Sequence, residues 1–195
     1  SALINKLGRL LQDMGQLEEA RPLFEESLQR YKETLGDRHP STLISIGNLG
    51  TLLTDMGQLE EAKPLYEEAL HARRETLGDR HPHTLTSISC VGTLLKAMGQ
   101  LEEARPLFEE ALQGRREKLG DRHPSTLVSI NKLGRLLADM GQLEEAKPLH
   151  EEDLQASSET LGDRHPNTLR SISCMTDLLR ATGALVEAEA VLGNA

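Results

Sequence analysis

The hexapeptide LGDRHP occurs four times in the chain, at residues 35–40, 77–82, 119–124 and 161–166. An Asp close to a His, held between Gly and Pro, could be a fragment of a catalytic or metal-binding site. The same residues could instead end one helix at the Gly and begin the next helix at the Pro. The copies are spaced by a constant 42 residues, which favours the second interpretation.

Repetition extends over the whole sequence. Residues 43–84 and 85–126 are identical at about 30 of 42 positions, and all eight prolines fall at two positions of the repeat. A glycine recurs with the same period at Gly15, Gly57, Gly99, Gly141 and Gly183. We therefore predict a single repeat domain over residues 1–195, with about four and a half units: 1–36 (partial), 37–78, 79–120, 121–162 and 163–195 (partial and degenerate).

Each unit is predicted to form two helices. In the second unit, apolar residues recur at a spacing of three and four over residues 43–53, which predicts a helix with one apolar face. Pro40 suits the first turn of this helix, and His39 or Asp37 could cap it. Gly57 would end the helix in a left-handed conformation. A second apolar helix would then follow and end before the glycine of the next LGDRHP.

The small and large residues of this unit resemble the tetratricopeptide repeat (TPR) at Leu49, Gly50, Leu53, Gly57, Leu59, Ala62, Tyr66 and Ala69. The period of 42, the run EEAKPLYEEAL and the GDRHP link are most similar to the longer repeats of kinesin light chains. This resemblance implies an all-α fold, a right-handed α-solenoid (superhelix) of antiparallel helix pairs. The first helix of each pair would line the concave face, and the second would lie outside.

Several residues would carry an energetic cost if they were buried or helical without a reason. A glycine inside a helix lowers the stability of the helix by about 1 kcal/mol relative to alanine. The first helices contain four such glycines: Gly8, Gly50, Gly92 and Gly134. We expect the paired helix to approach closely at these positions. The fourth unit has His150 where others have Phe or Tyr, and Asp153 where others have Ala or Ser. A buried Asp153 would be costly, so we expect it to find a partner or to reach water.

The composition excludes several classes of partner. The formal net charge of −9 disfavours binding to nucleic acid or to an anionic membrane surface. No stretch approaches the roughly 20 apolar residues of a membrane span, and no signal peptide is visible. Cys90 and Cys174 are consistent with a reducing compartment, and two repeats separate them, which is too far for a disulfide within one array. We expect a soluble cytoplasmic protein.

The residue patterns do not indicate catalysis. A metal site needs three or four ligands around one ion, whereas the histidines of LGDRHP should lie one repeat apart. His81 and His83 form a pair without a third ligand. Catalysis needs a unique constellation instead of four similar copies, and no glycine-rich phosphate loop is present. The sequence therefore predicts no enzyme activity, no metal and no cofactor.

Partner choice is expected to lie in outward-facing positions that differ between the repeats. Four such columns of the first helices, which we call the variable columns, begin at Asn5, Lys6, Arg9 and Gln12 and recur every 42 residues. They include the basic residues Lys6, Arg9, Lys96, Lys132, Arg135 and Arg180, while the second helices hold most of the glutamates. By resemblance, the groove would hold an extended peptide, with Asn side chains on its backbone and basic residues on its acidic groups. The candidate groove residues are Asn5, Lys6, Arg9, Asn48, Thr51, Thr93, Lys96, Asn131, Lys132 and Arg135.

The function predicted from these features is that of a protein–protein interaction module. It would bind a peptide or a partner segment, including acidic segments, in the concave groove, as part of a larger multidomain protein. The alternative is an architectural spacer or an idealised scaffold without a specific ligand, which the high identity of the repeats suggests. Both ends of the sequence depart from the repeat pattern, as expected of a piece of a longer array whose ends could stack on neighbouring molecules.

Overall fold

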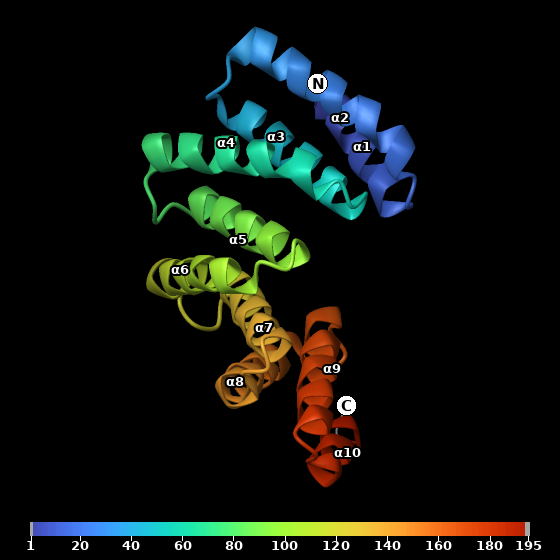
Figure 1. The fold of residues 1–195 in the computed structure, drawn as a ribbon, viewed down its shortest axis with the longest axis vertical. Helices are drawn as coiled ribbons and strands as arrows, with labels where there is room; N and C mark the ends of the chain where they lie inside the picture. The colour runs from blue at the N-terminus through green and yellow to red at the C-terminus, as the bar shows by residue number, and fades with distance from the viewer. Residues whose placement is uncertain (1, 194–195) are drawn as a thin grey trace. The chain divides into compact units, whose positions relative to one another are not determined.

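The computed structural model describes residues 2–193, so that Ser1 and residues 194–195 of the two partial repeats lie outside the description. All regular secondary structure in the described residues is helical (Figure 1). The helices are α1 (Ala2–Asp13), α2 (Leu17–Leu35), α3 (Pro40–Asp55), α4 (Leu59–Leu77), α5 (Pro82–Ala97), α6 (Leu101–Leu119), α7 (Pro124–Asp139), α8 (Leu143–Leu161), α9 (Pro166–Ala181) and α10 (Leu185–Gly193). The predicted all-α fold of consecutive helix pairs is confirmed.

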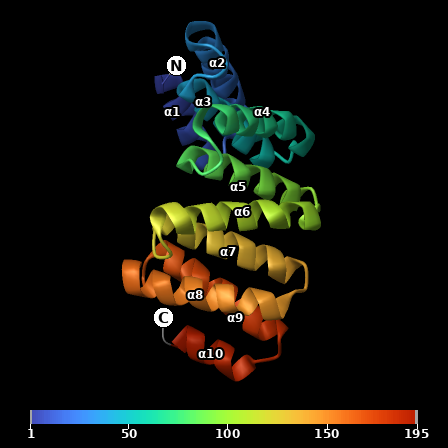
Figure 2. The same ribbon diagram turned by 90° about the vertical axis from the view of Figure 1, so that its left-hand side faces the viewer.

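The helices form two compact units, one over residues 1–100 with α1 to α5 and one over residues 101–195 with α6 to α10. Within each unit, every helix packs against the next helix along the chain. First helices of successive repeats also touch, α3 with α5 in the N-terminal unit and α7 with α9 in the C-terminal unit. Figure 2 shows the order within the C-terminal unit, from α6 through α7, α8 and α9 to α10. Short turns join these neighbours, as in antiparallel helix hairpins.

The LGDRHP segment is the joint between two helices. At its first copy, Gly36 ends α2 with φ 86° and ψ 166°, a conformation open essentially to glycine alone. Pro40 is the first residue of α3, and Nδ1 of His39 accepts a hydrogen bond from the backbone N–H of Ser41 at 3.1 Å. The imidazole of His39 is therefore the cap, and not Asp37. The same cap recurs at the other three copies, at His81, His123 and His165.

The other turn of each repeat ends the first helix. Gly57 follows α3 with φ 75°, so the predicted left-handed stop is confirmed. Its N–H donates to the carbonyl of Thr54, and the N–H of Gln58 donates to that of Leu53. These bonds satisfy two of the carbonyls that a helix end leaves without a partner.

The core of each unit is built mainly from aliphatic side chains and close helix contacts. One column of leucines from the first helices is almost completely buried: Leu52, Leu94, Leu136 and Leu178. A Cβ atom added at Gly50 would lie 2.9 Å from Cε1 of Tyr66, and one added at Gly134 would lie 2.9 Å from Cε1 of His150. A Cβ atom added at Gly8 would lie 3.2 Å from the nearest ring carbons of Phe24. The expected close approach of the paired helix is confirmed at these three glycines.

Candidate functional site

The ten groove residues predicted from the sequence lie on the first helices α1, α3, α5 and α7. Five of them are exposed to solvent: Lys6, Arg9, Thr51, Thr93 and Arg135. Four are half-buried: Asn5, Asn48, Lys96 and Lys132. Asn131 is only 3% exposed. Its amide therefore faces the interior of the C-terminal unit and cannot contact a ligand on the surface without rearrangement.

In the N-terminal unit, the structure brings the two predicted asparagines together. Nδ2 of Asn48 donates a hydrogen bond to Oδ1 of Asn5 at 3.3 Å, which joins α3 to α1. Also on α3, Oγ1 of Thr51 accepts a hydrogen bond from the hydroxyl of Tyr66 on α4 at 3.0 Å. These polar side chains thus join neighbouring helices in addition to facing solvent.

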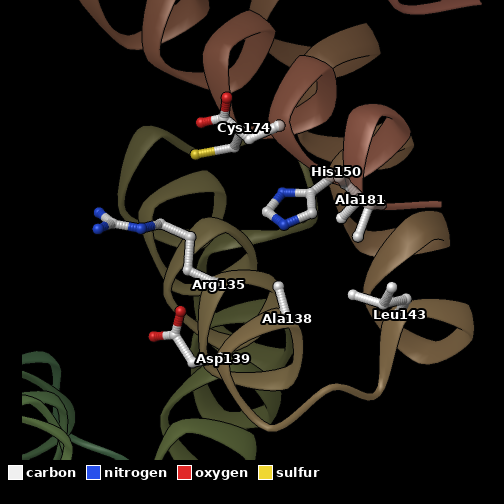
Figure 3. A pocket seen from close by; sticks show the side chains of 9 residues that line it. Arg135, Ala138, Asp139, Leu143, His150, Cys174 and Ala181 are labelled. Atoms are coloured by element: carbon white, nitrogen blue, oxygen red, sulfur yellow. The ribbon is translucent and has the colours of Figure 1, made fainter. Parts of the chain in front are cut away.

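The C-terminal unit contains a pocket of about 280 Å³ between α7, α8 and α9 (Figure 3). Arg135 comes from α7, His150 from α8, and Cys174 and Asp177 from α9. The other lining residues are Ala138, Asp139, Leu143, Leu178 and Ala181. Arg135, Ala138, Cys174 and Asp177 all belong to the variable columns of the first helices. The pocket therefore opens on the surface where the sequence places the partner contacts.

The pocket combines charged groups with apolar walls. Among the described residues, the exposed Arg135 forms no ion pair and no hydrogen bond, so its guanidinium can bind a carboxylate. The carboxylates of Asp139 and Asp177 also line the pocket. Nearby on α7, Nζ of Lys132 lies 6.0 Å from the centre of the Phe108 ring, within the range of a cation–π contact. The arrangement suits one apolar side chain with charged neighbours.

His150 replaces an aromatic residue at the inner wall of this pocket. The side chain is 1% exposed, and its ring packs against Gly134. Burial lowers the pKa of the imidazole, because a low-dielectric interior disfavours the cation, while the carboxylate of Asp153 acts in the opposite direction. Nδ1 has no hydrogen-bond partner among the described residues. The pocket is thus lined by an imidazole whose protonation is disfavoured by burial and whose Nδ1 is available to a ligand.

Asp153 is the centre of a buried polar network behind the pocket. Its carboxylate is 2% exposed and accepts hydrogen bonds from Nδ2 of Asn131 at 3.0 Å and from Oγ of Ser171 at 2.6 Å. Oγ of Ser157 donates a longer bond, at 3.4 Å. The expectation that a buried Asp153 finds partners is confirmed. This network explains why Asn131 points inward, since a buried carboxylate without donors would cost several kcal/mol.

The described residues offer no cluster suited to metal chemistry. Among them, no group of three or more His, Cys, Asp or Glu side chains is placed to hold an ion. Cys90 and Cys174 are both half-buried, and neither forms a disulfide within the described part of the chain. Within the described part of the chain, no helix combines the length and the apolar character needed to cross a bilayer.

Comparison with known families decides the relationship of the chain. The model of the tetratricopeptide repeat family matches residues 1–75 and 84–152. The chain belongs to the TPR family. TPR proteins generally serve as scaffolds for protein–protein interaction. A comparison with curated proteins finds no match.

Solved structures place this TPR chain near the kinesin light chain type. A Podosopora anserina protein, described as related to kinesin light chain with nearly identical TPR-like repeats, is 32% identical, with a TM-score of 0.84 over 99% of this chain and 91% of that one. A second structure under the same description gives a TM-score of 0.83 at 32% identity, over 98% and 91%. BtubC (BKLC) from P. vanneervenii shares the fold at 23% identity and a TM-score of 0.84, over 98% and 76%.

Of the ten groove residues predicted from the sequence, only Arg135 lines the pocket of the C-terminal unit. His150 was expected to differ from the aromatic residues at the same position of the other repeats, but it was not predicted to line a pocket. The signal was available, because a polar ring at a buried aromatic position indicates either a cost or a use. The contributions of Asp139 and Cys174 depend on how α7 and α9 pack, which no single column reveals.

Proposed function

We propose that this TPR chain is a protein-interaction module that binds a segment of a partner protein along the exposed faces of the first helices. The observation that carries the proposal is the pocket of the C-terminal unit. It is lined from α7 and α9 by residues of the variable columns, with the unpaired guanidinium of Arg135 at its edge. A site built from the residues that differ between repeats is what selective recognition requires.

The chemistry of the surface favours an acidic segment that carries an apolar residue. The stretch INKLGRLL occurs twice, at residues 4–11 and 130–137, and places a Lys and an Arg three positions apart on a first helix each time. Lys6, Arg9 and Arg135 are exposed. The walls formed by Leu143, Leu178 and Ala181 would hold the apolar residue. Exposed basic side chains would then attract the neighbouring carboxylates, most strongly at low salt.

A selection of ligands from a random peptide library displayed on phage tests this proposal with the intact chain. We expect enriched peptides to share acidic residues next to an apolar residue. The quadruple variant K6E/R9E/K132E/R135E should lose binding to these peptides. A control with the same change in net charge reverses four basic residues of the second helices, R30E/K63E/K118E/K147E, and should bind as the wild type does.

A second variant separates the pocket from general electrostatics. Ala138→Leu fills part of the pocket without a change in charge and should weaken the binding of the same peptides. Ala97→Leu, on an exposed position of α5, is its control. If the enriched peptides bind the quadruple charge-reversed variant and Ala138→Leu as tightly as the wild type, the groove proposal is wrong. A library that yields no enriched sequence would favour the spacer alternative.

A further inference from the structure

A second hollow lies in the N-terminal unit, away from the variable columns of the first helices. It has a volume of about 120 Å³ and lies where the end of α4 meets the starts of α3 and α5. Its apolar walls include Leu43, Ile44 and Leu77, and its basic residues are Arg38, Arg73 and His83. No Asp or Glu lines it among the described residues. A hollow of this size accepts a group no larger than a side chain.

Arg73 is the unusual member of this set. The residue is 8% exposed, and its Nη1 donates to Oγ of Ser87 at 2.5 Å and to the carbonyl of His83 at 3.5 Å. Among the described residues, no carboxylate lies within ion-pair distance of its guanidinium, and Nε and Nη2 make no hydrogen bond. Burial lowers the pKa of Arg73 because the cation is removed from water. The chain thus buries a positive charge without an anion, which is costly.

The fold does not require an arginine at this position. The equivalent residues are Tyr31 in the first repeat, Arg115 in the third and Ser157 in the fourth, and Nη1 of the buried Arg115 likewise donates to Oγ of Ser129. Around Ser157 the same walls recur 84 residues further along, with Leu127 for Leu43, Val128 for Ile44 and Leu161 for Leu77. The fourth repeat therefore has the same types of apolar residue around a serine instead of an arginine, which makes it an internal comparison.

The surroundings of the hollow provide a binding surface of mixed character. Ile44 is 45% exposed and Leu77 is 39% exposed, although both are large aliphatic residues. At the rim, the guanidinium of Arg38 pairs with Glu75 at 2.9 Å and remains largely in solvent. A ligand that covered Ile44 and Leu77 would remove their apolar surface from water, and its anionic end would face the unpaired Arg73.

We infer that this hollow, which we call the Arg73 site, binds a carboxylate that carries a short branched aliphatic group. Such a group occurs at the C-terminal residue of a polypeptide that ends in Leu, Ile or Val, and in free branched-chain carboxylic acids. Arg73 binds the carboxylate, and Ile44 and Leu77 cover the aliphatic group. The Arg73 site shares no residue with the pocket of the C-terminal unit, so it stands or falls independently of the proposed function.

Titration of the full chain with 4-methylpentanoate, observed through methyl NMR signals, tests the inference. The methyl signals of Ile44 and Leu77 should shift and saturate. The neutral 4-methylpentanamide, which has the same shape without the charge, should bind about ten-fold more weakly or not at all. The methyl signals of Val128 and Leu161, in the fourth repeat where Ser157 replaces the arginine, should stay in place with both compounds.

Two variants test the role of the residues. Arg73→Ser installs the residue of the fourth repeat. It should lower the affinity for 4-methylpentanoate about ten-fold or more and leave the circular dichroism spectrum unchanged. If Arg73→Ser does not fold, Ile44→Glu, at an exposed position, should abolish the shift of Leu77 by adding a like charge. N-acetyl-leucine in place of the free acid distinguishes the source: binding indicates a polypeptide C-terminus, and failure to bind indicates the free acid.

Equal binding of the acid and the amide would overturn the inference. So would an absence of shifts at Ile44 and Leu77, or unchanged affinity in a folded Arg73→Ser. Because peptide selection by the C-terminal unit is measured separately, a failure here leaves the proposed function intact, and the reverse holds as well.

Discussion

Gly47 and Gly50 lie one turn apart on α3 and have different surroundings. A Cβ at Gly50 would lie 2.9 Å from the Tyr66 ring, whereas a Cβ at Gly47 would meet nothing within 4 Å. We predict that Gly50→Ala destabilises the protein by about 1–3 kcal/mol, because the ring must move or the helices must separate. Gly47→Ala should stabilise it by up to about 1 kcal/mol through helix propensity alone. Urea unfolding of both variants gives the two free energies.

The two substitutions gain the same helix propensity, so the decisive result is that the free energy of unfolding changes in opposite directions. Equal effects of the two substitutions would show that the contact between α3 and Tyr66 does not require glycine. Gly47 also lies in the variable column that begins at Asn5. Gly47→Ala therefore shows, in addition, whether a small change at that face alters peptide binding.

His150 gives the C-terminal unit a pH dependence of stability. The pKa of a histidine in an unfolded chain is about 6.5, and burial lowers that of His150 in the native state. Well above pH 6.5 the imidazole is deprotonated in both states. As the pH falls below that value, the unfolded chain takes up a proton first, so the free energy of unfolding decreases until the native imidazole titrates. We predict that His150→Phe, which installs the residue of Phe24 and Phe108, reduces this decrease.

Denaturant unfolding at a series of pH values checks this prediction. The control is His71→Gln, at an exposed position of α4, which should leave the decrease caused by His150 in place. A wild-type profile identical to that of His150→Phe would show that the buried imidazole does not contribute.

At the scale of the helix, the histidine caps are the elements to test. The Nδ1 atom of His123 accepts from the N–H of Ser125 at 3.1 Å and caps α7, which carries Arg135. We predict that His123→Ala costs about 1 kcal/mol, whereas His123→Asn retains most of the stability because asparagine is a good N-cap. Urea midpoints of the two variants measure this difference. An alanine variant as stable as the asparagine variant would show that the proline at the first turn is sufficient.

Helix ends were the part of the fold that could be predicted best, because their signals are local. Gly57 and Pro40 restrict the backbone by themselves, whatever the helix packs against. The cap remained open between His39 and Asp37, since both residues can accept from a backbone N–H. The orientation of Asn131 was not predictable from its column, because a carboxylate on another helix, Asp153, holds it inside. Coupling of this kind depends on packing between helices.

At the scale of the whole chain, stability should follow the number of repeats. The helices contact mainly their neighbours in sequence, so each added unit contributes its own stability and one new interface. We predict that a chain with residues 79–120 duplicated has a higher urea midpoint, and that a chain with residues 79–120 deleted has a lower one. Unfolding followed by circular dichroism provides the midpoints. Identical midpoints in all three chains would contradict nearest-neighbour stacking.

The organisation as a single repeat domain over residues 1–195 remains a prediction. The repeats 37–78 and 121–162 each hold one helix pair within one compact unit. The period and the family followed from the sequence because near-identical copies make the alignment unambiguous. The pocket of the C-terminal unit did not, because it depends on how α7, α8 and α9 pack around His150, which replaces the aromatic residue of the other repeats.

The joint formed by LGDRHP has a consequence for the gene that encodes the chain. The stop of one helix and the cap of the next lie within six consecutive residues, and the same six residues recur at each boundary. A crossover between two misaligned copies therefore preserves the reading frame and leaves a complete joint on both sides. The array can gain or lose a helix pair in a single recombination event of this kind. Copy number is thus easier to change in this chain than the geometry of any single turn.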